Sequence, residues 1–108
     1  MFTQTKYRNK PTIYRGRKYA SIAEAEYAMN LDWKVKAGEV ISWTPQVKIP
    51  LVVHGTKICD YIIDFFVVDK NQVEQFVEVK GCETKDWKIK WKLAHVLYPE
   101  RNFLLVKN

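Results

Sequence analysis

The sequence predicts an α/β fold in which a mixed central sheet is flanked by helices. Two segments carry apolar residues at helical spacing, and residues 61 to 68 form an almost continuous apolar run. The predicted order is helix, three strands, helix, strand, which places a crossover helix before the last strand. A chain of 108 residues, 47% hydrophobic and 28% charged, has the composition of one globular domain with a modest core.

The first part of the chain is expected to form an arm and a short hairpin. Residues 1 to 12 are polar and basic and predict a flexible arm, so the single folded domain spans residues 13 to 108. Residues 13 to 19 predict a hairpin whose turn is Arg15-Gly16, because glycine accepts the positive φ of a tight turn.

The first long helix and two extended segments follow the hairpin. From Ser21 to residue 37 apolar residues recur at four-residue spacing, and Gly38 follows as a natural C-terminal cap. Residues 40 to 43 and 47 to 53 then have the composition of strands. One proline lies between them and another lies inside the second, so we expect both segments at sheet edges or bulges.

The second half of the chain predicts two strands, a helix and a last strand. Residues 61 to 68 are apolar except for one aspartate, as in a strand buried on both faces. A polar turn separates this strand from residues 73 to 80, which predicts a hairpin. Residues 86 to 98 have helical spacing and end before a proline. Residues 103 to 106 then predict a strand that joins the sheet in parallel.

The charge of the chain indicates a nucleic-acid partner. The net charge is +6, the pI is near 9.3, and the basic residues gather in two stretches of the sequence. Two such clusters on one face would attract a polyanion and release its counterions, although a solvated basic surface is the alternative. The residues expected to contact nucleic acid are Arg15, Arg17, Lys18, Lys85, Lys88, Lys90 and Lys92.

Cysteine content and hydropathy exclude several classes of protein. Cys59 and Cys82 are too few for a disulfide scaffold and lack the spacing of a structural zinc site, so we expect reduced thiols. No apolar run approaches the roughly 20 residues that span a membrane, and the first residues lack a signal-peptide core. These features predict an intracellular, cytoplasmic protein that does not associate with membranes.

Two carboxylates and a lysine carry the predicted chemistry. Asp64 lies inside an apolar strand and Glu78 lies on the next strand, and a buried carboxylate needs a cation or a metal as a partner. Oxygen ligands suit Mg²⁺ or Mn²⁺. Lys80 lies on the same face as Glu78, about 7 Å further along the strand, where an ammonium group could reach a phosphate or an attacking water. This combination predicts phosphodiester hydrolysis.

The spacing of these residues resembles a known nuclease motif. Asp64, thirteen intervening residues and then Glu78-Val79-Lys80 are similar to the central motif of the PD-(D/E)XK superfamily, although Ile63 replaces the proline of that motif. The predicted order of elements resembles the superfamily's restriction-endonuclease-like core. Residues 13 to 106 also resemble short phage proteins grouped as a domain of unknown function. The stretches that carry this resemblance are Ser21 to Tyr27, Lys36 to Glu39, Gln46 to Lys48, Tyr61 to Phe65, Glu78 to Gly81, Thr84 and Lys90 to Leu93.

The resemblance implies further residues and a substrate. In such nucleases a helix glutamate completes the metal site and a strand glutamine can join the active site, which implies Glu24 and Gln46 here. The implied metal ligands are then Asp64, Glu78 and Glu24, with Mg²⁺ or Mn²⁺ as the cofactor. Similar motifs in Holliday-junction resolvases imply a homodimeric endonuclease that acts on branched DNA in phage recombination and DNA metabolism, within a bacterial host.

Several of these residues have a structural alternative. Glu24 also completes a capping box at the start of its helix. Asp64 could instead form a buried salt bridge with Lys80. Trp87 and Trp91 lie at helical spacing and are expected in the core or at a dimer contact rather than as base-stacking platforms.

The function has two alternatives of its own. The chain could be a nucleic-acid-binding phage protein that keeps the nuclease fold without catalysis. It could also be a nuclease subunit that needs a targeting protein partner, as in the end-cleaving endonuclease of some transposons.

Overall fold

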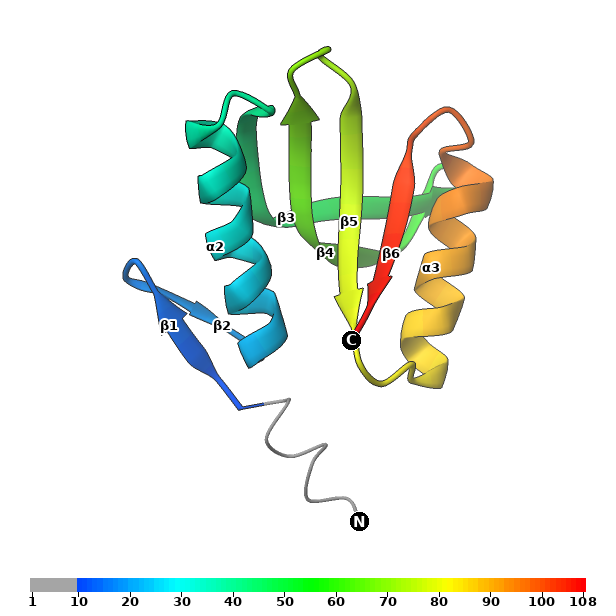
Figure 1. Cartoon of the computed structure of the whole chain (residues 1–108). Coiled ribbons are helices and arrows are strands. Elements are labelled where there is room, and N and C mark those ends of the chain that lie inside the picture. Colours follow the sequence, from blue (N-terminus) through cyan, green and yellow to red (C-terminus); the bar gives the residue numbers. More distant parts are fainter. Residues whose placement is uncertain (1–9) are drawn as a thin grey trace.

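A computed structural model describes residues 10–108. They form a four-stranded sheet with two helices, preceded by a separate two-stranded hairpin (Figure 1). The predicted arm lies outside the described residues up to residue 9, and its last residue, Thr12, already begins the first strand. In chain order the elements are β1 (Thr12–Tyr14), β2 (Arg17–Tyr19), α2 (Ile22–Lys36), β3 (Val40–Val53), β4 (Thr56–Asp69), β5 (Glu74–Lys80), α3 (Lys85–Leu97) and β6 (Phe103–Lys107).

The central sheet is mixed and has the strand order β3-β4-β5-β6. The strands β3, β4 and β5 pair antiparallel, and β6 pairs parallel with β5. The crossover between β5 and β6 contains α3, as a parallel connection requires. The α/β class, the order of elements and the parallel last strand are therefore confirmed. Neither helix of residues 10–108 is long and apolar enough to cross a membrane.

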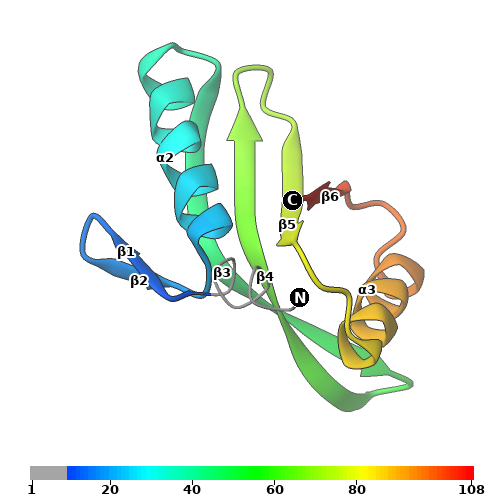
Figure 2. The ribbon, with the colours of Figure 1, turned by 60° about the horizontal axis from the view of Figure 1, so that its bottom comes forward.

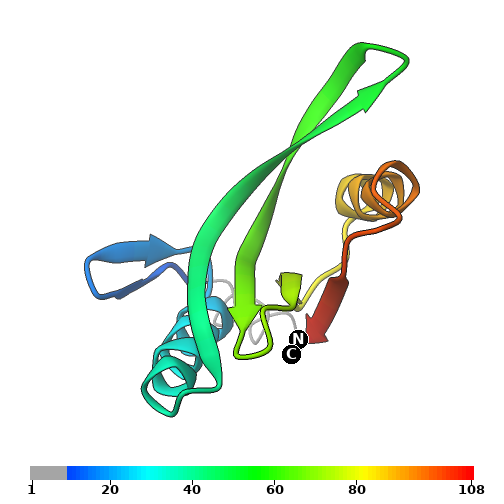
Figure 3. The same ribbon diagram turned by 90° about the horizontal axis from the view of Figure 1, so that it is seen from above.

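The hairpin of β3 and β4 is longer than predicted. The separate segments expected at 40 to 43 and 47 to 53 form one strand, and β4 begins at Thr56 rather than at residue 61. Both prolines lie in β3, which is an edge strand of the described sheet, as predicted. Viewed from above, this hairpin curls from beside α2 toward α3 (Figure 3).

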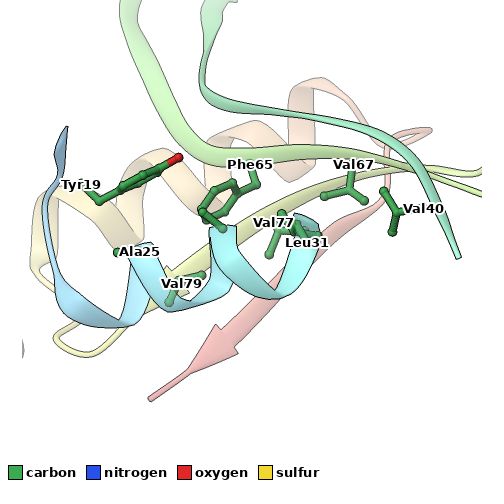
Figure 4. Packing of buried hydrophobic residues seen from close by; sticks show 9 residues of the cluster. Tyr19, Ala25, Leu31, Val40, Phe65, Val67, Val77 and Val79 are labelled. Atoms are coloured by element: carbon green, nitrogen blue, oxygen red, sulfur yellow. The ribbon is translucent and has the colours of Figure 1, made fainter. Parts of the chain in front are cut away.

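The helix α2 covers one half of the sheet. Its N-cap is Ser21, whose Oγ accepts from the backbone N–H of Glu24 at 3.1 Å, and Gly38 follows its end at φ +79°. Beneath it lies a cluster centred on the fully buried Phe65 and Leu31 (Figure 4). The predicted helix of residues 21 to 37 is thus confirmed to within a residue at each end.

The helix α3 packs on the opposite face of β5, because the neighbouring residues Phe76 and Val77 belong to the clusters under α3 and α2 respectively. Its N-cap is Thr84, whose Oγ1 accepts from the backbone N–H of Trp87 at 3.2 Å, and the helix starts one residue earlier than predicted. Trp87 and Ala94 pack on a second buried cluster with Tyr61 and Ile63 of β4. Trp87 is 7% exposed, which confirms it as a core residue. One strand, β4, therefore supplies the cores under both helices.

Candidate active site

The five residues predicted to be catalytic line one cleft, which we call the carboxylate cleft. Its volume is about 460 Å³, and its lining includes the last residue of β5 and residues in the first turns of both helices. Figures 1 and 2 show the end of β5 between the starts of α2 and α3. Its lining is drawn from β3, β4, β5, both helices and the segments that precede the helices. The predicted residues in the lining are Glu24, Gln46, Asp64, Glu78 and Lys80. The sheet and the two helix starts thus bring together residues that are far apart in the sequence.

Asp64 is held where β4 and β5 separate. The pairing of the two strands stops at Phe65 and Val77. Beyond that point the backbone N–H of Val79 donates to Asp64 Oδ2 at 2.7 Å, so the side chain takes the place of a strand carbonyl. The sequence predicted that the strand carboxylates would meet where these strands diverge, and Asp64 lies there.

Glu78 is the most buried charged residue described, with 3% of its surface exposed. The Tyr61 hydroxyl donates to its Oε1 at 2.7 Å, and Lys80 Nζ lies 3.3 Å from its Oε2. Trp87 Nε1 donates in turn to the Tyr61 hydroxyl at 3.0 Å. The salt bridge considered between Asp64 and Lys80 is not formed, because Lys80 pairs with Glu78 instead.

The negative charges of the carboxyl groups in this cluster are not fully balanced by nearby positive charges. Burial, and then the negative charges of Glu78 and Glu24, raise the pKa of Asp64 to about 8. Burial also raises the pKa of Glu78, while hydrogen bonds from Tyr61, Lys80 and the carboxyl of Asp64 lower it. Both carboxyls therefore ionise less readily than they would in water, as close carboxyls do when no cation lies between them.

Glu24 faces the cleft from the first turn of α2. Burial, and then the charge of Glu78, raise its pKa, while Lys80, the backbone of Ala20 and the Ser21 hydroxyl lower it. Within residues 10–108, no three His, Cys, Asp or Glu side chains converge closely enough to hold a metal ion. Glu24 lies near the carboxylate pair without joining it, and half of the predicted capping box is present at Ser21.

Gln46 lies across the hairpin from Asp64. The pairs Pro45–Phe65 and Val47–Ile63 bracket the two residues, and Gln46 has a positive φ of 54° inside β3. Its Oε1 accepts from Arg17 Nη1 at 3.3 Å, which brings a predicted basic residue of β2 to the edge of the cleft.

The predicted basic residues do not gather in one place. Lys90 lines the carboxylate cleft and its Nζ donates to the carbonyl of Asp60 at 3.3 Å. Lys88 and Lys92 line a different groove of α3. Lys18 and Lys85 are exposed and line neither, and Arg15 lies 3.8 Å from Asp32.

Sequence reasoning missed Tyr61 as a site residue. It stands at the start of an apolar strand, and a buried tyrosine hydroxyl needs a polar partner. That requirement could have pointed to a polar contact of Tyr61 from the sequence, but it would not have identified Glu78 as the partner. Thr84, Asp86 and Trp87 were also not expected in the cleft, and they reach it because α3 starts beside the end of β5.

Comparison with known proteins places the chain in one family. No curated protein and no solved structure matches it significantly. The family model described as a protein of unknown function, DUF1064, matches residues 4–108, which is nearly the whole sequence. The chain therefore belongs to the DUF1064 family.

Proposed function

We propose that this protein is a metal-dependent nuclease of the PD-(D/E)XK type that hydrolyses phosphodiester bonds in DNA. One observation carries the proposal. Asp64 and Glu78 come from neighbouring strands, line one cleft with Lys80, and have raised pKa values, as close carboxyl groups have when no cation lies between them. A structural ion pair alone would leave one carboxylate and one cation, whereas this cleft has an excess of carboxylates.

The chemistry of the two strand carboxylates suits a small divalent ion. Carboxylate oxygens are the ligands that Mg²⁺ and Mn²⁺ prefer, and a cation between two repelling carboxyls would replace the proton held there. Asp64 and Glu78 would hold the ion, and Glu24 is the nearby carboxylate that could complete the set. When bound, the ion polarises a phosphoryl oxygen and acidifies a water.

The remaining groups have defined tasks in this proposal. The Lys80 ammonium, oriented by Glu78, supplies positive charge for a phosphate oxygen or for the attacking water. The first turns of α2 and α3 border the cleft, and the N-terminal end of a helix favours anions. Gln46 and Lys90 line the open edge, where they can contact the nucleic-acid backbone.

Branched DNA is the proposed substrate, and a homodimer is the proposed state, because the resemblance to junction resolvases implies both. A dimer would place two clefts for two symmetric cuts. Catalysis that depends on a targeting partner and binding without catalysis are the competing outcomes of the test below.

The test is a cleavage assay with purified protein. Four-way junction, flap, hairpin and linear duplex DNA are incubated with Mg²⁺, Mn²⁺ or a chelator. We expect cleavage only with metal, and losses of about 10²- to 10³-fold in Asp64→Asn and Lys80→Ala. Asp64→Asn keeps an oxygen that can accept from Val79, so the local fold is retained.

The matched control is Glu26→Gln, which neutralises an exposed carboxylate on the same helix as Glu24. It should cleave like the wild type. Equal rates in wild type and Asp64→Asn would contradict the proposed site. Metal-independent binding without any cleavage would favour the non-catalytic alternative, and cleavage only with an added host or phage protein would favour the partner-dependent one.

A further inference from the structure

A second groove runs between α3 and β6, and we call it the α3–β6 groove. Its volume is about 390 Å³. The helix contributes two tryptophans, two lysines and a histidine, and β6 contributes Leu105 and Lys107. Among its lining residues, Trp87 also lines the carboxylate cleft, so the two hollows adjoin at the first turn of α3.

The floor of the α3–β6 groove is aromatic. Trp91 stacks with Trp87 at a ring-centroid distance of 5.4 Å and meets His95 edge-on at 4.6 Å. The ring of His95 is held by contact of its Nδ1 with the Trp91 carbonyl at 2.7 Å. Trp91 is only half-buried and lines the groove. A fixed aromatic ring of this kind is a surface on which a nucleobase can stack.

The rim of the groove is basic. Lys88 and Lys92 are exposed one turn apart on α3, and within residues 10–108 no carboxylate lies within ion-pair distance of either. Lys107 lies 3.1 Å from Glu83, which is the acidic residue of the lining. The positive charges of Lys88 and Lys92 are thus not neutralised by a carboxylate, and they lie beside aromatic rings. This combination suits nucleic acid, because the lysines can bind phosphates and the rings can stack with bases.

We propose that the α3–β6 groove binds an unpaired DNA strand that leaves the carboxylate cleft around the start of α3. A base lies against Trp91, and the phosphates on either side lie near Lys88 and Lys92. A paired base inside a duplex has both faces covered by its neighbours, so the aromatic floor selects a single strand. The route of the strand rests on the proposed nuclease function, whereas the binding itself does not require catalysis.

Strand binding is tested on the full chain in chelator, where cleavage does not interfere. The anisotropy of a labelled oligothymidylate and of a labelled duplex is measured during titration with protein at several salt concentrations. For Lys88→Glu with Lys92→Glu, we expect binding of the oligothymidylate to weaken by about tenfold or more. The slope of log affinity against log salt should fall by about 0.7 for each lost phosphate contact.

The matched control is Lys34→Glu with Lys70→Glu, which changes the net charge equally at two exposed lysines remote from the groove. It should bind the oligothymidylate much more tightly than the groove variant does. Equal weakening in the two double variants would overturn the proposal, because the binding would then depend on net charge alone.

Stacking is tested separately at Trp91. Trp91→Phe keeps an aromatic face, whereas Trp91→Leu keeps apolar packing without one. We expect the leucine variant to bind the oligothymidylate about tenfold more weakly and the phenylalanine variant to fall between it and the wild type. Circular dichroism checks that both variants fold, and the lysine variants keep the proposal testable if Trp91→Leu does not.

Three other results would overturn the proposal. They are equal affinity of the Trp91 variants, duplex bound as tightly as the single strand, and a dimer that dissociates on groove mutation. The last result would assign the groove to a second copy of the chain. Asp64→Asn separates this proposal from the nuclease function, since it should bind the oligothymidylate normally whether or not the wild type cleaves DNA.

Discussion

At the scale of single residues, the carboxylate cleft depends on a buried hydrogen-bond chain. Trp87 donates to Tyr61, Tyr61 donates to Glu78, and Glu78 pairs with Lys80. Each group in this chain would lose a partner inside the core if its neighbour were removed, and an unpaired buried polar group is costly. In the proposed mechanism Tyr61 is thus a positioning residue, which acts by holding Glu78.

Tyr61→Phe tests this chain. The change leaves the Glu78 carboxylate without one of its donors and the Trp87 N–H without its acceptor, so the free energy of unfolding should fall by about 1–3 kcal/mol. Urea denaturation measures the loss. Tyr98→Phe makes the same chemical change at an exposed bond to the Pro50 carbonyl and should cost clearly less. A smaller loss for Tyr61→Phe than for Tyr98→Phe would contradict the assigned role.

Among the secondary-structure elements, the hairpin of β3 and β4 packs against α2 along one part of its length and against α3 along another. Phe65 lies under α2, whereas Tyr61 and Ile63 lie in the cluster under α3. Between these regions stand Asp64 and Gln46, and the positive φ of Gln46 departs from strand geometry at this point. A left-handed residue of this type costs about 1–2 kcal/mol unless it is glycine.

Gln46→Gly tests whether the strained backbone at this position is kept because the amide side chain is needed in the cleft. Glycine relieves the strained φ but increases the freedom of the unfolded chain, so stability should stay within about 1 kcal/mol of the wild type. DNA cleavage should nevertheless decrease, because the amide is lost from the cleft. The comparison is Lys48→Gly, on the same exposed strand without a positive φ, which should lose about 0.5–1 kcal/mol. A larger loss for Gln46→Gly would show that φ is not the constraint.

At the scale of the whole molecule, the carboxylate cleft lies where the two cores adjoin. The sheet end and the starts of both helices meet there (Figure 2). The carboxyls are buried by packing that forms only when both halves of the protein are folded. The electrostatic state of the cleft is therefore coupled to global stability.

This coupling predicts the pH dependence of unfolding in chelator. Asp64 has a pKa of about 8 in the fold against 3.8 as its ordinary value, so the folded state holds a proton that the unfolded chain releases. The free energy of unfolding should therefore fall as pH rises from about 4 to 8, by at most about 1.4 kcal/mol per pH unit for this one group. Denaturation at several pH values measures the slope. Asp64→Asn should flatten it, and an unchanged slope would contradict the assignment.

The elements and the chemical types of the candidate site could be predicted from local sequence patterns. Ile22–Lys36 form a helix because their apolar spacing matches the helical period, and Asp64 is conspicuous because a charge interrupts an apolar strand. The order of elements and the parallel last strand also follow from local patterns and short connections. These are properties of neighbours in the chain, which a sequence records directly.

The assembly of the cleft, in contrast, could not be predicted from the sequence and depends on tertiary contacts. In the folded protein Lys80 pairs with Glu78 rather than with Asp64, and Tyr61 donates a hydrogen bond to Glu78. Lys88 and Lys90 lie on the same helix but line different hollows. Two predicted segments also join into one edge strand. These outcomes depend on strand register, on the point where two strands separate and on burial between distant segments, which local spacing does not specify.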